Sequence, residues 1–237
     1  MHVVIPSRFN GPPSSGNGGW VSGFVAAHTP VDDDAPAVSV RLHLPPPLDR
    51  PLTLEPGTPP GSGAPGFRTV LRDGDAVVAS AAAAPSPAGE VPDPVTPEVA
   101  RDAETRGITA EDHPFPTCYG CGPLHPDGLR IRSGPVTGRN TLYAAMWTPR
   151  NTSPPEVWAA LDCPGGKAAG FPTTLMVLGT MTAQVFTPPA VGVEHVVLSW
   201  SRGDEGRKRH ASSALFTADG RLLAHAEQTW IAIDRPV

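Results

Sequence analysis

Two segments of this 237-residue chain share one pattern, in which an Asp-Gly pair separates two apolar-rich runs. The first segment spans residues 66–84 around Asp73-Gly74, and the second spans residues 211–233 around Asp219-Gly220. Asp-Gly between such runs favours a type I′ hairpin turn, because that turn needs positive φ at both central residues. The sequence therefore predicts two antiparallel hairpins.

The segments upstream of the two hairpins also correspond. A strand pattern at 36–44 precedes the first hairpin, and strand patterns at 173–186 and 194–200 precede the second. Each half opens with a Trp-containing helical segment, at 14–28 and at 154–170. Two copies of one unit predict an α+β fold built by internal duplication, with two packed domains, because the repeat is far longer than that of a solenoid.

The halves are joined by a Pro-rich stretch at 85–95, which favours extended backbone. A helix is expected next over 96–107, with Thr96 as N-cap and Pro97 in the first turn. We place an N-terminal domain at 1–84, a linker with this helix and a CxxC turn at 85–125, and a C-terminal domain at 126–237.

Composition excludes several classes of function. The net charge is −5, and no basic stripe extends beyond residues 207–209, so a nucleic-acid partner is not expected. No apolar run approaches the roughly 20 residues of a membrane span, and the N-terminus does not have the pattern of a signal peptide. Three cysteines give no disulfide framework. We expect a cytoplasmic protein without membrane contact.

The duplicated unit resembles the double hotdog arrangement, and its second half resembles the type II acyl-CoA thioesterases. Residues 16–27 resemble the Gly-Gly opening of the first hotdog helix, and residues 159–166 match in position a Leu/Ile-Asp pair of those enzymes. Residues 216–231 are similar to their final hairpin, in which a Gln follows the Asp-Gly turn by one strand. Residues 116–131 also resemble a segment of thioesterase-like proteins. The resemblance implies a double hotdog fold, with the two sheets joined into one.

The resemblance further implies hydrolysis of an acyl thioester by water. It assigns the carboxylate to Asp162, the group that orients the water to Gln228, and a hydroxyl residue to the position of Ser201 or Arg202, of which Ser201 carries the hydroxyl. For Asp162, the alternative is that it faces solvent or caps the chain after the helix. A helix end or a kink is expected here, because Pro164 removes a helical hydrogen bond and Gly165-Gly166 loosens the turn. An end would place Asp162 near the negative C-terminal end of the helix dipole.

The two hairpins differ in polarity. The first has Ala81-Ala82-Ala83 where the second has Ala226-Glu227-Gln228, which predicts one active site rather than two. Because Glu227 and Gln228 are adjacent in a strand, one of them must point inward. If that residue is Gln228, Asp162 is its candidate polar partner.

Substrate contacts are expected at two places. Gly18 and Gly19 open the first helix and could present backbone N–H groups to an oxyanion, or could belong to a flexible loop. The segment 201–210 contains four cationic side chains suited to the phosphates of coenzyme A, or to a solvated loop; they are Arg202, Arg207, Lys208 and Arg209.

Cys118 and Cys121 form a CxxC pair between His113 and His125, an incomplete pattern for zinc, which normally takes four ligands. Cys163 would be a third ligand only if the linker folds back on the helix. A compact buried turn before a strand at 128–134 is the interpretation we favour, so no metal and no cofactor are predicted.

Three functional hypotheses remain: a thioester hydrolase acting on acyl-CoA, a non-catalytic module that binds acyl-CoA or another apolar ligand, and a metal-stabilised module centred on the CxxC turn. The resemblance also allows a homodimer of double hotdogs.

Overall fold

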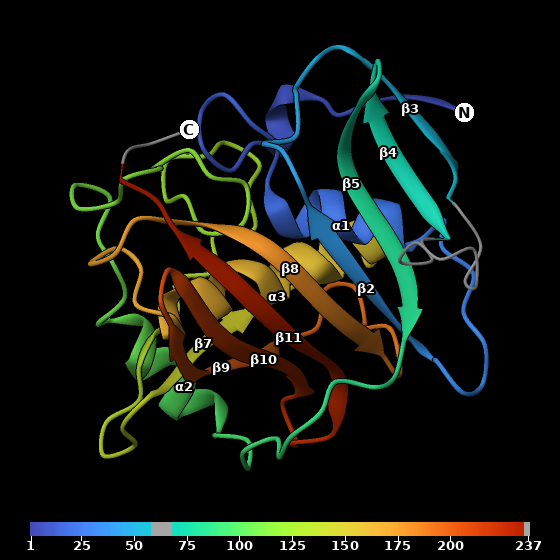
Figure 1. Cartoon of the computed structure of the whole chain (residues 1–237). Coiled ribbons are helices and arrows are strands. Elements are labelled where there is room, and N and C mark those ends of the chain that lie inside the picture. The colour runs from blue at the N-terminus through green and yellow to red at the C-terminus, as the bar shows by residue number, and fades with distance from the viewer. Residues whose placement is uncertain (58–67, 235–237) are drawn as a thin grey trace.

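The computed structural model describes residues 1–57 and 68–234. Within them, one antiparallel sheet of 11 strands curves around two helices, α1 (Gly18–Ala26) and α3 (Pro154–Ala168), which lie together on one face (Figure 1). A third helix, α2 (Pro97–Glu104), packs on the other face against β7. The main core lies between the sheet and the helices α1 and α3.

The strand order across the sheet is β1-β3-β4-β5-β2-β8-β11-β10-β9-β7-β6. The strands are β1 (His2–Val4), β2 (Ala37–Leu42), β3 (Pro51–Pro56), β4 (Thr69–Asp73), β5 (Ala76–Ala84), β6 (Gly134–Pro135), β7 (Leu142–Trp147), β8 (Met176–Val185), β9 (His195–Glu205), β10 (Lys208–Thr217) and β11 (Leu222–Ala232).

The predicted duplication is visible in this order. Outward from the centre, one half reads β2, β5, β4, β3, β1, and the other reads β8, β11, β10, β9, β7. The helices α1 and α3 occupy equivalent places, each between the outer strand and the central strand of its half in the chain. The halves join where β2 pairs with β8, with Val38 opposite Ala183. The fold is the double hotdog that the sequence predicts, while the domain boundaries at 84/85 and 125/126 remain a prediction.

Both Asp-Gly hairpins form, as β4–β5 and β10–β11. Their turns differ from the expected type I′, because only the glycine of each pair has positive φ, 56° at Gly74 and 91° at Gly220. Residues 66 and 67, at the start of the first predicted hairpin segment, lie outside the described residues. The helix α2 also forms as predicted, with the Thr96 hydroxyl accepting the N–H of Val99 at 3.5 Å.

The expected helix end at Pro164 is wrong, since α3 continues through it to Ala168. The reason is tertiary packing: the helix is buried from Glu156 to Ala168. At Gly165 a Cβ atom would overlap the side-chain amide of Gln228, and at Gly166 it would lie 3.0 Å from the Trp230 ring. The two glycines therefore let β11 approach α3, and burial of the helix outweighs the local preference to end it.

The strand predicted at 128–134 is also wrong, and only the short β6 forms at its end. The N–H of Leu129 donates to the carbonyl of Tyr119 at 2.7 Å, and that of Ile131 to Gly120 at 3.0 Å. The segment is thus tied to the CxxC turn rather than to the sheet. Across the described residues, no helix has the length and apolar character needed to cross a membrane.

Candidate functional site

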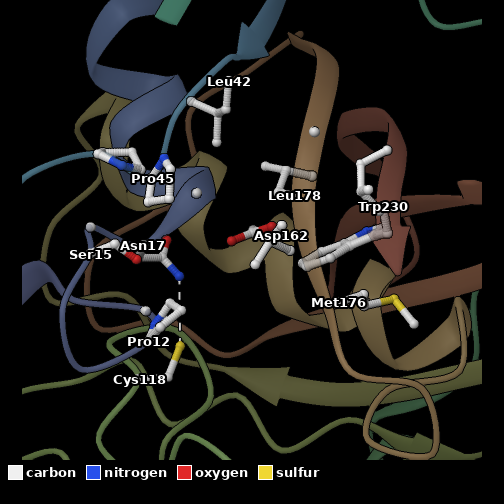
Figure 2. Close-up of a pocket in the computed structure, with 18 of the residues that line it drawn as sticks. Pro12, Ser15, Asn17, Leu42, Pro45, Cys118, Asp162, Met176, Leu178 and Trp230 are labelled. Carbon is white, nitrogen blue, oxygen red and sulfur yellow. Dashed lines mark hydrogen bonds between the residues drawn. The ribbon is translucent and has the colours of Figure 1, made fainter. Parts of the chain in front are cut away.

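A cavity of about 270 Å³ opens at the N-terminus of α1, where β8 and β11 pass close to it (Figure 2). Its wall is mostly apolar and includes Leu42, Pro45, Phe115, Phe171, Met176, Leu178, Trp230 and Ile231. A cavity with apolar walls and few polar groups is typical of a site for a small organic ligand. The acidic group in the wall is Asp162, on α3.

The Asp162 side chain is buried, with 2% of its residue surface exposed. Its Oδ2 atom accepts the backbone N–H of Gly19 at 2.8 Å, and within residues 1–57 and 68–234 its Oδ1 atom has no hydrogen-bond partner. Figure 2 shows the carboxylate between the α1 N-terminus at Asn17 and the apolar side chains of Leu178 and Trp230. One carboxylate oxygen is therefore fixed by the protein, and the other is left to a molecule in the cavity.

Glycine at position 19 makes this contact possible. A Cβ atom there would overlap the Asp162 side chain and lie 2.7 Å from the Trp158 carbonyl oxygen. A Cβ atom on Gly23, one turn later, would likewise lie 2.7 Å from the Pro154 carbonyl oxygen. The two glycines let α1 and α3 pack backbone to backbone.

Burial raises the pKa of Asp162 to about 7, and the hydrogen bond from Gly19 opposes that rise. The positive end of the α1 dipole also favours a negative charge at this place. The environment that the sequence predicted, a negative helix C-terminus, is absent because α3 does not end after Asp162.

Gln228 points inward, as one of the two adjacent polar residues had to, while Glu227 on the other face forms an ion pair with Arg202. Its Nε2 atom donates to the Leu161 carbonyl at 2.7 Å and to the Ser213 hydroxyl at 3.0 Å. Its Oε1 atom accepts Nε1–H of Trp230 at 3.1 Å. Gln228 thus holds the residue that precedes Asp162, and it does not line the cavity.

The predicted hydroxyl residue, Ser201, lies in the row Ser201–Ala211–Gln228 across the sheet. Its Oγ atom accepts the N–H of Gly203 at 3.3 Å, and the residue does not line the cavity. The hydroxyl that contacts Gln228 belongs to Ser213, which also donates to the Leu161 carbonyl at 2.8 Å. Ser213 was not predicted from the sequence, where the available signal was that one of the adjacent Ser212 and Ser213 must face inward.

Gly18 and Gly19 do open α1, and Gly18 lines the cavity. The N–H of Gly19 is used by Asp162, so this group is not free for an oxyanion while that hydrogen bond lasts.

The four cationic residues of the β9–β10 hairpin all have local partners. Arg202 pairs with Glu227, Lys208 with Glu205 at 3.7 Å, and Arg209 with Asp204 at 2.9 Å, whereas Arg207 donates to the Ala232 carbonyl at 2.9 Å. Lys208 stands opposite Ile231 in the sheet, and Ile231 lines the cavity. The hairpin tip therefore lies at the same end of the sheet as the cavity.

Comparison with known proteins gives structural but not sequence relatives. No protein-family model matches the chain, and no curated protein matches it by sequence. Among solved structures, it is similar to a putative thioesterase II from Thermobifida fusca YX, with TM-score 0.64, 15% identity, and 98% of this chain and 91% of that chain covered. It is also similar to an acyl-CoA thioesterase II from Mycobacterium marinum, with TM-score 0.60, 12% identity, and coverage of 100% and 93%.

A dehydratase domain of a mycocerosic acid synthase-like polyketide synthase gives a similar match, with TM-score 0.59, 13% identity, and coverage of 99% and 95%. At these identities the matches show the double hotdog fold. Since that fold carries both reactions, the function has to be argued from the site.

Proposed function

We propose that the cavity beside Asp162 binds an acyl thioester and that the protein hydrolyses it. The observation that carries the proposal is the Asp162 carboxylate at an apolar cavity wall. Gly19 holds its Oδ2, while its buried Oδ1 has no partner in the part of the chain that the structure describes. The thioesterases among the structural neighbours support thioester hydrolysis in general.

In this proposal, Oδ1 of Asp162 accepts a proton from a water molecule in the cavity while the water oxygen attacks the thioester carbonyl carbon. The C–S bond then breaks, and the proton held by Asp162 passes to the departing thiolate, so that a carboxylic acid and a free thiol are released. The hydrogen bond from Gly19 fixes the orientation of the carboxylate, so that Oδ1 and not Oδ2 meets the water. The acyl chain lies against the apolar wall formed by residues such as Leu42, Leu178 and Trp230.

Gln228 takes a different part from the one predicted by resemblance. Its amide is occupied by Leu161, Ser213 and Trp230, so we assign it a positioning role, in which it holds the turn of α3 that carries Asp162. Ser213 shares this role through its bond to the Leu161 carbonyl.

Coenzyme A is the carrier that we propose. The tip of the β9–β10 hairpin lies beside the cavity, where Lys208 is opposite Ile231, and its cationic groups suit the phosphates of the nucleotide end. The ion pair of Lys208 with Glu205 is long, at 3.7 Å, and exposed, so exchanging it for a phosphate contact costs little.

The test is release of free thiol from a panel of acyl-CoAs, with Asp162→Asn as the isosteric variant. Turnover by the wild type that is lost in the variant supports hydrolysis. Binding of acyl-CoA without thiol release would instead identify a non-catalytic module, and dehydration of a hydroxyacyl thioester without thiol release would place the chain with the dehydratases of this fold.

A further inference from the structure

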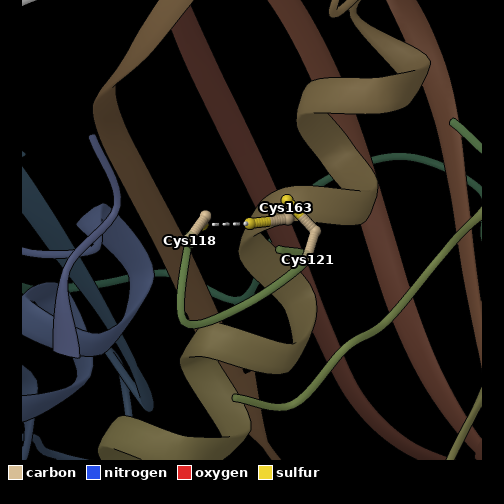
Figure 3. Close-up of side chains that lie close together, drawn as sticks. All are labelled: Cys118, Cys121 and Cys163. Carbon is tan, nitrogen blue, oxygen red and sulfur yellow. Dashed lines mark hydrogen bonds between the residues drawn. The ribbon is translucent and has the colours of Figure 1, made fainter. Parts of the chain in front are cut away.

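The linker folds back on α3 and brings three buried cysteines together. Cys118 and Cys121 lie on the turn, Cys163 lies on α3, and Figure 3 shows their side chains facing one another. All three sulfur atoms lie within 4.8 Å of one another, and Sγ of Cys118 is 3.7 Å from Sγ of Cys163. The sequence made Cys163 a candidate third ligand only if the linker folds back on the helix, and the structure meets this condition.

The distances between the three sulfur atoms match a metal site rather than a disulfide. Two thiolates on a tetrahedral zinc ion, each about 2.3 Å from the metal, are about 3.8 Å apart, whereas bonded sulfurs are about 2 Å apart. Glycine at position 120, between the two turn cysteines, lets the turn lie close to Cys163. A Cβ atom on Gly120 would be only 2.6 Å from Sγ of Cys163.

Hydrogen-bond donors surround the sulfurs. Nδ2 of Asn17 lies 3.7 Å from Sγ of Cys118 and 3.8 Å from Sγ of Cys163, and Nε2 of His113 lies 3.3 Å from Sγ of Cys121. Donors of this kind stabilise thiolate ligands and fix their direction.

His113 is such a donor and not a ligand. Its Nδ1 atom accepts the N–H of Phe115 at 3.0 Å, so in the neutral ring the proton is on Nε2, the atom that faces Cys121. The protein thus supplies three sulfur ligands. Cys118 and Cys163 line the cavity, so a water molecule from it is the candidate for the fourth position.

A buried lysine lies beside the cluster, and its Nζ atom has no hydrogen-bond partner among the described residues. Lys167 lies one helical turn after Cys163, is 4% exposed, and places Nζ 4.4 Å from the centre of the Phe171 ring. A buried ammonium group needs a nearby negative charge. Three thiolates and one divalent cation carry a net charge of −1, which favours a positive charge on Lys167.

We propose that Cys118, Cys121 and Cys163 bind one Zn²⁺ ion, with Asn17, His113 and Lys167 around it. The ion would fasten the linker to α3 at the edge of the cavity. Thiolate ligands select zinc over Mg²⁺ and Ca²⁺, which prefer oxygen.

The direct test uses the full wild-type chain purified from zinc-supplemented cells. Elemental analysis should find about one zinc per chain, and replacement by Co²⁺ should give the intense thiolate-to-cobalt charge-transfer absorption. Zinc that stays far below one per chain after incubation with Zn²⁺, or a disulfide among the three cysteines, would overturn the proposal. Neither measurement needs a variant that folds.

Variants then identify the ligands. Cys118→Ser, Cys121→Ser and Cys163→Ser should each lose most of the zinc, whereas His113→Gln should retain it with weaker affinity. Full loss in His113→Gln, or zinc retained in all three serine variants, contradicts the assigned ligands. Asp162→Asn should retain zinc while losing hydrolysis, so the metal proposal and the proposed function fail independently.

Discussion

The backbone N–H of Gly19 donates to Oδ2 of Asp162 across the two halves of the molecule, at 2.8 Å. Gly19 belongs to the first half and Asp162 to the second, so the candidate site exists only when α1 and α3 are packed together. In this double hotdog, the candidate site is therefore built on the contact between α1 and α3.

Gly19→Ala should weaken the packing of α1 on α3 and impair the candidate site. The added methyl group would overlap Asp162, so α1 and α3 must separate, and overpacking of this kind costs about 1–3 kcal/mol. We expect a lower free energy of unfolding in denaturant titrations and a lower kcat for thioester hydrolysis. A variant with unchanged stability and unchanged kcat would show that the close contact is unimportant.

The packing of Gln228 on Gly165 can be measured by a double-mutant cycle. Gln228→Ala removes the hydrogen bonds of the amide to Leu161, Ser213 and Trp230 and should cost about 1–3 kcal/mol of unfolding free energy. Gly165→Ala should destabilise the wild type, because the new Cβ atom overlaps the Gln228 amide.

In the Gln228→Ala background the overlap is removed, and Gly165→Ala should become neutral or stabilising by up to about 1 kcal/mol through helix propensity. Equal effects of Gly165→Ala in the two backgrounds would contradict the assigned packing.

The architecture was predictable because its determinants are local. The turns at Gly74 and Gly220, the apolar alternation of the strands and the cap at Thr96 each act within a few residues, and the repetition of the unit supplied the duplication.

The site was only partly predictable. Asp162 stood out as a carboxylate in an apolar helix, but its partner Gly19 is 143 residues away and contributes only a backbone N–H. The continuation of α3 past Pro164 depends on contacts of Gly165 and Gly166 with β11, and the meeting of Cys163 with the CxxC turn depends on the path of the linker. These are tertiary contacts that no local pattern encodes.

Carrier specificity is expected to depend on Lys208. Lys208→Ala should raise KM for acyl-CoA about tenfold, because one charge-assisted hydrogen bond is lost. The variant should change kcat little. KM for an acyl-pantetheine, which lacks the nucleotide phosphates, should not change. Arg139→Ala, which removes an exposed cation that donates to the Asp93 carbonyl, is the control and should leave both KM values unchanged. Equal KM changes for the two substrates would contradict a phosphate contact.

Acid should destabilise the fold through His225. This buried ring stacks on Trp200, and its Nε2 atom has no hydrogen-bond partner in the described part of the chain. Burial, with Arg202 nearby, lowers the pKa of His225 to about 4. The unfolded chain has a His pKa of about 6.5, so it binds the proton first, and stability is lost as the pH falls from about 6.5 to about 4.

The loss from this residue should be on the order of 3 kcal/mol over that pH range. In His225→Phe, the free energy of unfolding should decline less than in the wild type between pH 7.5 and 4.5. Parallel pH profiles of the two proteins would contradict this assignment.

In the proposed reaction, Asp162 acts as the base that takes a proton from water during thioester hydrolysis. The most direct measurement is the rate of thiol release from acyl-CoAs by the wild type and by Asp162→Asn, which keeps the side-chain size and an oxygen for Gly19. We predict that kcat falls about 10²- to 10⁴-fold, the usual contribution of a general base, while acyl-CoA still binds. Hydrolysis by Asp162→Asn at the wild-type rate would contradict the role of Asp162 as the base.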